Sequence, residues 1–150
     1  MSKTTSARAT TTPGPEPRPR RRKKAAENGS AASTGLPPEL TLAARAAYEK
    51  KATGVVVLDL RKAQAFTDYF FVCTGQNARQ VKAIADAIDT ALANEGHKPA
   101  HVEGYDRANW ILLDYFTFIV HVFAPDAREF YDIERLWGSA GRTEMPDPAV

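Results

Sequence analysis

Carboxylate and histidine side chains are the residues of this sequence whose types and spacing could support catalysis or metal binding. Asp59, Asp68 and Asp114 each lie in or beside a segment with strand-like composition, where a nucleotidyl-transfer site could be built. Metal-assisted phosphoryl transfer requires clustered acids that hold Mg²⁺, and the sequence contains no Asp-x-Asp pair. A nucleotidyltransferase-like, metal-dependent enzyme is therefore kept only as the alternative to a non-enzymatic binding protein.

The three histidines do not form a recognisable metal site. His97 and His101 could bind one metal ion only from a helix, and Pro99 between them disfavours a helix. The sequence has no HExxH, CxxC, P-loop or GxSxG motif. We therefore expect no metal, no cofactor and no catalytic residues.

Asp114 and the third histidine, His121, belong instead to an apolar run, "WILLDYFTFIVHVF", at residues 110–123. Two strands separated by so few residues should pair as a hairpin, with Leu112 opposite His121. Side chains alternate along a strand, so the hairpin has two faces. A core face carries Ile111, Leu113, Tyr115, Phe118, Val120 and Val122. The other face carries Trp110, Leu112, Asp114, Ile119, His121 and Phe123.

Two arrangements fit the second face. Helices of the same chain could cover it, and Asp114 and His121 would then need internal hydrogen-bond partners, because unpaired buried charge is costly. Alternatively, another protein could cover it, since interface centres combine aromatic and aliphatic side chains with a few polar anchors. The residues alone leave both arrangements open.

The elements that would position these residues follow the order α-β-β-α-β-β-β-α. They are a helix at 39–51, strands at 55–60 and 68–75, a helix at 77–96, a short strand within 98–105, the two hairpin strands and a helix from 126 onward. The last helix has an apolar stripe of Phe130, Ile133 and Trp137. Strands and helices do not strictly alternate, so we predict an α/β fold with a mixed sheet of about four to five strands covered by helices.

Composition divides the chain into three segments. Residues 1–35 hold eight Lys or Arg residues, two Glu residues and almost no large apolar side chain, so we expect a disordered basic tail. Its formal net charge is +6, whereas that of the remainder is −4. Residues 36–138 should form the folded domain, and residues 139–150 a flexible C-terminal tail. The run "RPRRRKK" could attract nucleic-acid phosphates, such as those of ribosomal RNA, but a solvated extension is favoured, and an organelle transit peptide is a third alternative.

The expected location is the cytoplasm, with an organelle as a minor alternative. The single cysteine, Cys73, cannot form an internal disulfide, which is typical of cytosolic proteins. No apolar run approaches the roughly 18 residues needed to cross a membrane, so no membrane contact is expected.

Four segments carry a resemblance to a known family. They read "TDYFFVCTGQNARQVKAIADAI", "VEGYDRANWILLDY", "VHVF" and "REFYDIERLW". Taken together in this order and spacing, across about residues 38–137, they resemble the ribosomal silencing factor family, also called iojap-related. The resemblance implies a nucleotidyltransferase-like α/β fold without the catalytic acids. It also implies a translational repressor that binds the large ribosomal subunit through its protein number fourteen, blocks joining of the small subunit, and is a homodimer when free.

The resemblance also bears on the open choice about the hairpin. The family's Trp–apolar–Asp–Tyr and Val–His–Val patterns match residues 110–115 and 120–122, which favours an exposed, partner-binding face. The family usually has a small residue or Gly and an Asp before the second strand, where this chain has Phe116 and Thr117. We expect Trp110 to be the central apolar anchor. The predicted partner-binding residues are Trp110, Leu112, Asp114, Tyr115, Ile119, His121 and Phe123.

Overall fold

The computed structural model describes residues 35–138 and 140–148 of the chain. Contacts divide the chain into two compact units, Met1–Pro38 and Glu39–Val150, and the second unit carries the fold. Nearly all of the expected basic tail, residues 1–34, lies outside the described residues.

One open mixed sheet of six strands forms the centre of the second unit, in the order β4-β5-β6-β3-β2-β7. The strands are β2 (Thr53–Asp59), β3 (Tyr69–Thr74), β4 (His101–Glu103), β5 (Trp110–Asp114), β6 (Phe118–Phe123) and β7 (Gly141–Glu144). β3 and β6 are parallel, and every other neighbouring pair is antiparallel. The predicted α/β class with a mixed sheet is confirmed, with one strand more than the four to five expected.

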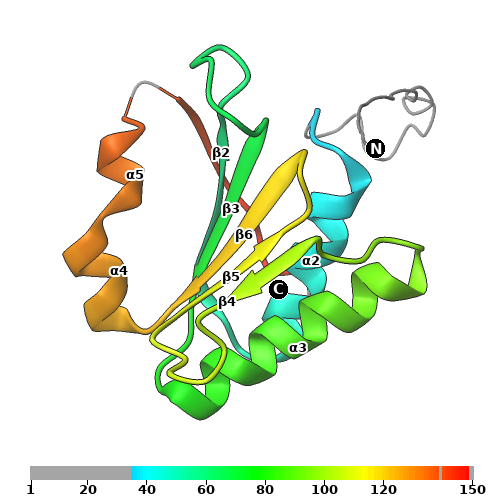
Figure 1. Cartoon of the computed structure of the whole chain (residues 1–150), viewed down its shortest axis with the longest axis vertical. Coiled ribbons are helices and arrows are strands. Elements are labelled where there is room, and N and C mark those ends of the chain that lie inside the picture. The colour runs from blue at the N-terminus through cyan, green and yellow to red at the C-terminus, as the bar shows by residue number, and fades with distance from the viewer. Residues whose placement is uncertain (1–34, 139, 149–150) are drawn as a thin grey trace, which may run out of the picture. The chain divides into compact units, whose positions relative to one another are not determined.

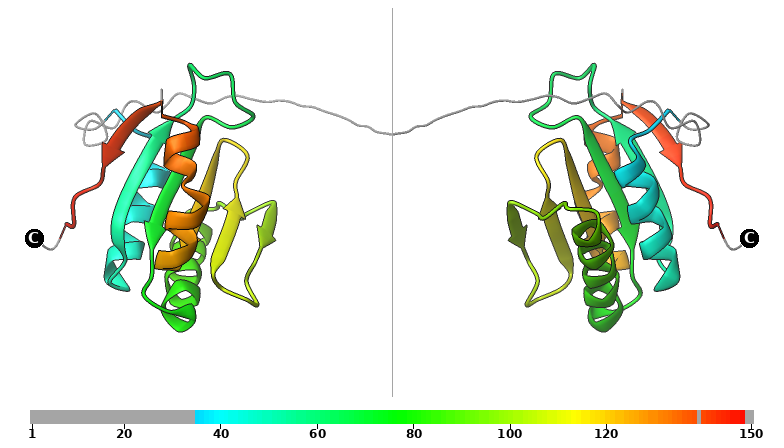
Figure 2. Two further views of the ribbon diagram at one scale, coloured as in Figure 1. Left: turned by 90° about the vertical axis from the view of Figure 1, so that its left-hand side faces the viewer. Right: turned by 90° about the vertical axis from the view of Figure 1, so that its right-hand side faces the viewer.

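Helices lie against both faces of this sheet. α2 (Pro38–Glu49) and α3 (Ala78–Asn94) pack on one face, and α4 (Pro125–Tyr131) and α5 (Ile133–Leu136) lie on the other. Figure 1 shows the strands between the two pairs of helices, and the two views of Figure 2 show one pair in front of the sheet at a time. The hairpin strand β6 therefore has helices on both sides.

The helix α3 forms as its sequence predicts. The Asn77 side chain accepts a hydrogen bond from the backbone N–H of Gln80 at 2.9 Å, and Gln80 Oε1 accepts one from the backbone N–H of Gln76 at 2.6 Å. The buried residues recur every three or four positions, at Val81, Ile84, Ala85, Ile88 and Leu92. This stripe packs against β5 and β6, so one face of the hairpin is fully covered by α3 and its neighbours.

The expected flexible tail at 139–150 is wrong for Gly141–Glu144, which form the edge strand β7. These residues pair antiparallel with β2, and Met145 after them is buried. The β7 side chains are polar and mostly exposed, so the strand is held by backbone hydrogen bonds to β2. A strand of this kind has no apolar alternation, which is why its sequence did not reveal it.

The last helix also differs from expectation. Its predicted start at Asp126 is one residue late, and at Asp132 the backbone adopts a left-handed conformation (φ 46°) that separates α4 from α5. The predicted apolar stripe of Phe130, Ile133 and Trp137 required one continuous helix. The break places Phe130 and Ile133 in different helices, and Phe130 is 80% exposed whereas Ile133 is buried.

Candidate partner-binding surface

The strands β5 and β6 pair in the register predicted from the sequence. Leu112 lies opposite His121, and Asp114 lies opposite Ile119. One row of side chains faces α3, and the alternate row faces the side of α4 and α5. We call this alternate row the hairpin face. Its members are Trp110, Leu112, Asp114, Ile119, His121 and Phe123.

The two strands of the hairpin face differ in exposure. The β6 members are buried, namely Ile119, His121 and Phe123. The β5 members are half-buried, namely Trp110, Leu112 and Asp114. The sequence left open whether helices of the same chain or another protein cover this face. The structure combines the two, because the protein's own helices cover the β6 row and leave the β5 row accessible. The prediction that the three β6 residues present themselves to a partner is therefore corrected, since they belong to the core.

A second hydrophobic core explains this burial. It joins the sheet to α4 and α5 and consists of Val56, Leu58, Leu60, Phe70, Val72, Ile119, Phe123, Ala127 and Ile133. Trp110, Leu112 and Trp137 pack against it while remaining partly exposed. These three side chains mark the boundary at which the core meets the surface.

His121 is buried because it has an internal hydrogen-bond partner. The indole Nε1–H of Trp110 donates to Nδ1 of His121 at 3.0 Å, so the neutral imidazole carries its proton on Nε2. The ring also lies edge-on to Phe70, with 4.5 Å between ring centres. Burial lowers the pKa of His121 to about 3, so the ring is neutral near pH 7. His121 therefore orients Trp110 from beneath.

The other two polar candidates have structural contacts of their own. A carboxylate oxygen of Asp114 accepts a hydrogen bond from the backbone N–H of Phe116 at 2.8 Å, which holds the β5–β6 turn. Tyr115 is buried on the opposite face and stacks on Phe118, with 4.8 Å between ring centres. Burial raises the pKa of Tyr115. The structure thus does not bring Tyr115 together with the hairpin face, and its predicted partner contact is corrected.

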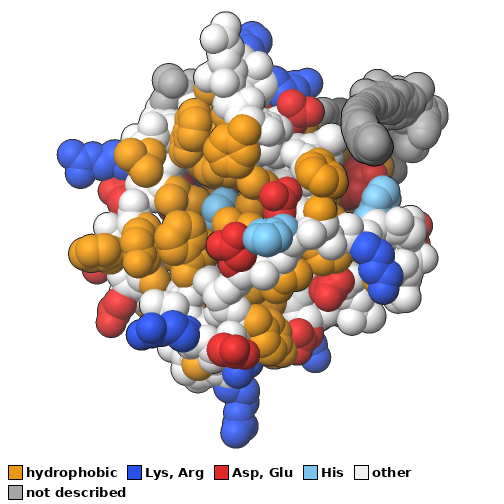
Figure 3. All heavy atoms as spheres, in the orientation of Figure 1, with side chains coloured by type: hydrophobic (Ala, Val, Ile, Leu, Met, Phe, Trp, Pro, Cys, Tyr) orange, Lys and Arg blue, Asp and Glu red, His pale blue; other side chains and the backbone are white. Residues whose placement is uncertain are grey.

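Aromatic side chains of α4 extend the accessible part of the hairpin face. Tyr131 is 42% exposed and packs against Trp110, with 4.6 Å between ring centres, and Phe130 packs against Tyr131 at 5.0 Å. Figure 3 shows hydrophobic side chains gathered on the side where Figure 1 places α4 and α5. Contiguous exposed apolar side chains are typical of interaction surfaces. We call Trp110, Leu112, Phe130 and Tyr131 the docking surface.

The helical residues of the docking surface were missed by sequence reasoning. The spacing of Phe130 within an apparent helix assigned it to the core, and the left-handed residue that interrupts the helix has no distinctive sequence signal. Phe130 lies before the break at Asp132 and is exposed on α4, whereas Ile133 after the break is buried.

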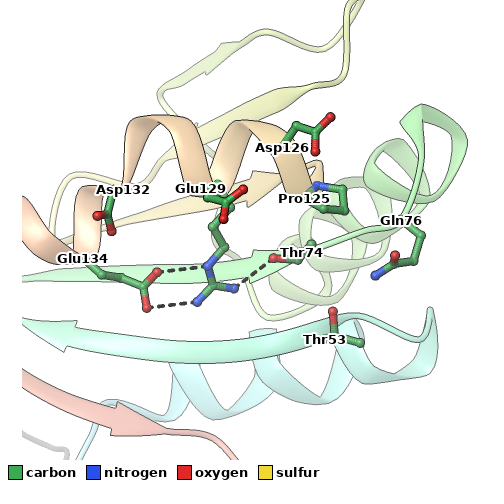
Figure 4. Close-up of a pocket in the computed structure, with 9 residues that line it drawn as sticks. Thr53, Thr74, Gln76, Pro125, Asp126, Glu129, Asp132 and Glu134 are labelled. Atoms are coloured by element: carbon green, nitrogen blue, oxygen red, sulfur yellow. Dashed lines mark hydrogen bonds and ion pairs between the residues drawn. The ribbon is translucent and has the colours of Figure 1, made fainter.

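A polar pocket of about 490 Å³ lies beside α4 (Figure 4). Its central side chain is Arg128, which donates hydrogen bonds to the carbonyl oxygen of Gly54 at 2.6 Å, to Oγ1 of Thr74 at 2.9 Å, and to both carboxylate oxygens of Glu134 at 3.0 Å. Hydrogen bonding to Arg128 lowers the pKa of Glu134. Because every guanidinium nitrogen has a protein partner, Arg128 ties α4 to β2, β3 and α5 and is not a free cation for a substrate.

Two of the three carboxylates considered for catalysis, Asp59 and Asp114, have structural partners. Asp59 forms two side-chain hydrogen bonds with Arg61, at 2.9 and 2.7 Å, and Asp114 holds a turn. Across residues 35–138 and 140–148, no group of three or more His, Cys, Asp or Glu side chains is arranged to hold a metal ion. Within the same ranges, no helix has the length and apolar character needed to cross a membrane.

Comparison with known proteins connects this chain to a family. Residues 33–149 match the family model "Ribosomal silencing factor during starvation". The ribosomal silencing factor RsfS of Halalkalibacterium halodurans is 38% identical over 106 residues, which cover 71% of this chain and 91% of that protein. The RsfS of Bacillus subtilis is 39% identical over 106 residues, covering 71% of this chain and 90% of its own length. The chloroplastic protein Iojap of Zea mays is 35% identical, over 69% of this chain and 45% of its own length.

Solved structures show the same fold. A crystal structure of a Chromobacterium violaceum protein has 34% sequence identity and a TM-score of 0.66, covering 75% of this chain and 91% of that chain. A crystal structure from Bacillus halodurans has 37% identity and a TM-score of 0.62, covering 70% of this chain and 95% of that chain. The family model spans most of the chain, and the sheet order, hairpin and docking surface occupy the matched region. The chain belongs to the ribosomal silencing factor family.

Proposed function

We propose that this protein binds the large ribosomal subunit through its docking surface and represses translation by blocking the joining of the small subunit. The observation that carries the proposal is the accessible apolar row beside Trp110, in a chain whose family is named for ribosomal silencing. Steric exclusion needs affinity and correct position and no chemistry. This fits a face on which Asp114 and His121 both form hydrogen bonds within the chain.

The geometry around Trp110 suits a binding anchor. Its indole ring is held by the hydrogen bond to His121, by stacking on Phe123 and by contact with Tyr131, and it remains partly exposed. Aromatic side chains that are already rigid lose little conformational entropy on binding, so more of the contact free energy appears as affinity. Leu112 and Phe130 supply additional apolar area beside the anchor.

The proposed occupant on the ribosome is large-subunit protein number fourteen, as the family resemblance implies. A second copy of this chain would cover the same apolar surface in the free protein, because contiguous exposed apolar area favours self-association in water. The two occupants exclude each other, so a homodimer would have to dissociate before the docking surface reaches the ribosome. A weak contact of the basic tail with ribosomal RNA would add to the attraction.

The proposal is tested by placing a charge on the docking surface while keeping the hydrogen bond between Trp110 and His121. Leu112→Arg is the suitable variant, because Leu112 is half-buried and makes no side-chain hydrogen bond, whereas Trp110→Ala would also remove the partner of His121. We expect affinity for isolated large subunits, measured by cosedimentation, to fall by roughly a hundredfold, because a charge would be desolvated at the centre of an interface. Inhibition of subunit joining should be lost in parallel.

Val102→Arg is the matched control. Val102 is 45% exposed, and it pairs with Leu113 on the opposite side of the sheet. This control should bind as the unmodified protein does, and both variants should unfold at similar temperatures. Undiminished cosedimentation and subunit-joining inhibition by Leu112→Arg would refute the proposal.

A further inference from the structure

Phe116, in the turn between β5 and β6, combines two costly features. Its backbone is left-handed (φ 72°), a region that bulky side chains rarely adopt and that glycine adopts readily. Its ring is also 73% exposed, so the side chain contributes little to the core. A glycine at this position would satisfy the turn with less strain, so the fold itself gives no reason for a phenyl ring here.

The turn holds Phe116 rigidly in this conformation. Its backbone N–H donates to Asp114 Oδ1 at 2.8 Å, and its carbonyl oxygen accepts a hydrogen bond from Oγ1 of Thr67 at 2.7 Å. The next residue is held as well, because the N–H of Thr117 donates to the carbonyl of Tyr115 at 2.9 Å. Residues kept in sparsely populated conformations by their surroundings are concentrated at functional positions.

A second exposed ring lies on the neighbouring loop. Phe66, in the β2–β3 loop, is 76% exposed, and this loop is bonded to the β5–β6 turn through Thr67. Figures 1 and 2 show the loop and the turn at the same end of the sheet. The Phe66 ring meets Phe70 with 6.2 Å between ring centres, and Phe70 in turn contacts His121 beneath the hairpin face. Phe66 and the hairpin face therefore contact a common buried ring, that of Phe70.

We infer that Phe116, with Phe66 beside it, is a second anchor that inserts into an apolar recess of the same large-subunit protein that the docking surface binds. This inference rests on the proposed function, because it extends that one contact around the end of the sheet. Two separated anchors would fix the orientation of the domain on its partner, which a single apolar row does not do.

The local charges favour a protein over ribosomal RNA as the occupant. Binding to unpaired bases combines aromatic stacking with a positively charged surround. Here Arg61 is bound by Asp59, and the β2–β3 loop and the hairpin carry two cations, Arg61 and Lys62, against three carboxylates, Asp59, Asp68 and Asp114. An apolar anchor without excess positive charge matches a recess in a protein surface.

The test uses substitutions of Phe116 that separate binding from stability. Phe116→Gly and Phe116→Asn suit the left-handed backbone and remove the ring, so their thermal midpoints should equal or exceed that of the unmodified chain. Phe116→Ala keeps the strain and also removes the ring. All three should bind isolated large subunits about tenfold more weakly, because an aromatic anchor is lost in each. Val102→Ala, a truncation of an exposed apolar residue elsewhere, should bind normally.

Each outcome distinguishes the inference from the function on which it rests. If Leu112→Arg abolishes binding while Phe116→Gly binds normally, the second anchor is wrong and the docking surface stands. If affinities follow thermal midpoints instead of the presence of the ring, Phe116 is structural and the inference is overturned. If Phe116→Gly weakens binding equally to large-subunit ribosomal RNA stripped of protein, the occupant is RNA, which also overturns it. If the unmodified chain does not cosediment with large subunits, the proposed function itself fails.

Discussion

At the scale of single residues, the central pair is Trp110 and His121. Burial keeps the imidazole neutral, and the indole N–H satisfies its Nδ1, whereas Nε2 has no hydrogen-bond partner among the described residues. The pair also positions the largest apolar side chain of the docking surface. His121 is thus a core residue that determines how a surface residue is presented.

The depressed pKa of His121 predicts acid sensitivity. Below about pH 6.5 the unfolded chain binds a proton that the folded chain does not bind until about pH 3, so stability falls as the pH falls through this window. Between about pH 7.5 and pH 5 we expect the unmodified chain to lose about 2 kcal/mol more unfolding free energy than His121→Gln, which keeps an acceptor for Trp110 and cannot titrate. Urea unfolding at the two pH values measures this difference. Equal losses in both proteins would show that His121 protonates freely in the folded state.

At the scale of elements, the break between α4 and α5 shapes the docking surface. Asp132 ends α4 with a left-handed residue, and Arg128 then joins α4 to Glu134 of α5 and to Thr74 of β3. This network fixes the position of α4, and with it Phe130 and Tyr131, over the sheet. Two short helices would otherwise have little intrinsic stability.

Arg128→Lys is expected to loosen α4 although it preserves the charge. An ammonium group cannot reproduce the paired contact with Glu134 together with the bonds to Thr74 and Gly54, so we expect a loss of about 2 kcal/mol of unfolding free energy. Hydrogen exchange of the α4 amides should accelerate more than that of α3. Arg135→Lys, on the exposed side of α5, is the matched control and should change neither quantity. Unchanged protection of α4 in Arg128→Lys would show that packing alone holds the helix.

At the scale of the whole molecule, charge is unevenly distributed along the chain. Residues 1–35 carry a formal net charge of +6 and the remainder carries −4. In the proposed function the docking surface would bind through apolar contact, whereas the tail would add only salt-sensitive attraction to ribosomal RNA. The two contributions therefore differ in their dependence on ionic strength.

Deleting residues 1–35 should weaken association with large subunits modestly, by about threefold at roughly 50 mM salt, and by much less at about 300 mM salt. Cosedimentation over a salt series measures both effects, and the deletion should reduce the steepness of the salt dependence. Loss of association at every salt concentration would make the tail the main ribosome-binding element and would contradict the role given to the docking surface.

Local sequence patterns were sufficient for much of the fold. The apolar repeat and the Asn77 cap defined α3, and the alternation in residues 110–123 predicted the β5–β6 register correctly. These features depend on neighbours in the sequence, so periodicity and capping chemistry carry the information. The same segments, in their order and spacing, were enough to indicate the ribosomal silencing family.

Tertiary structure decided which parts of the predicted site reach the surface. Ile119 and His121 share a face with Leu112, yet only Leu112 remains accessible. The second core beneath α4 and α5 covers the β6 row and does not extend fully over β5. β7 likewise forms only because the edge of β2 is available for pairing. Phe130 and Ile133 differ in burial across a single left-handed residue, Asp132, that separates their helices. Burial is a property of contacts between segments distant in sequence, and hydrophobic alternation specifies a face without specifying what covers it.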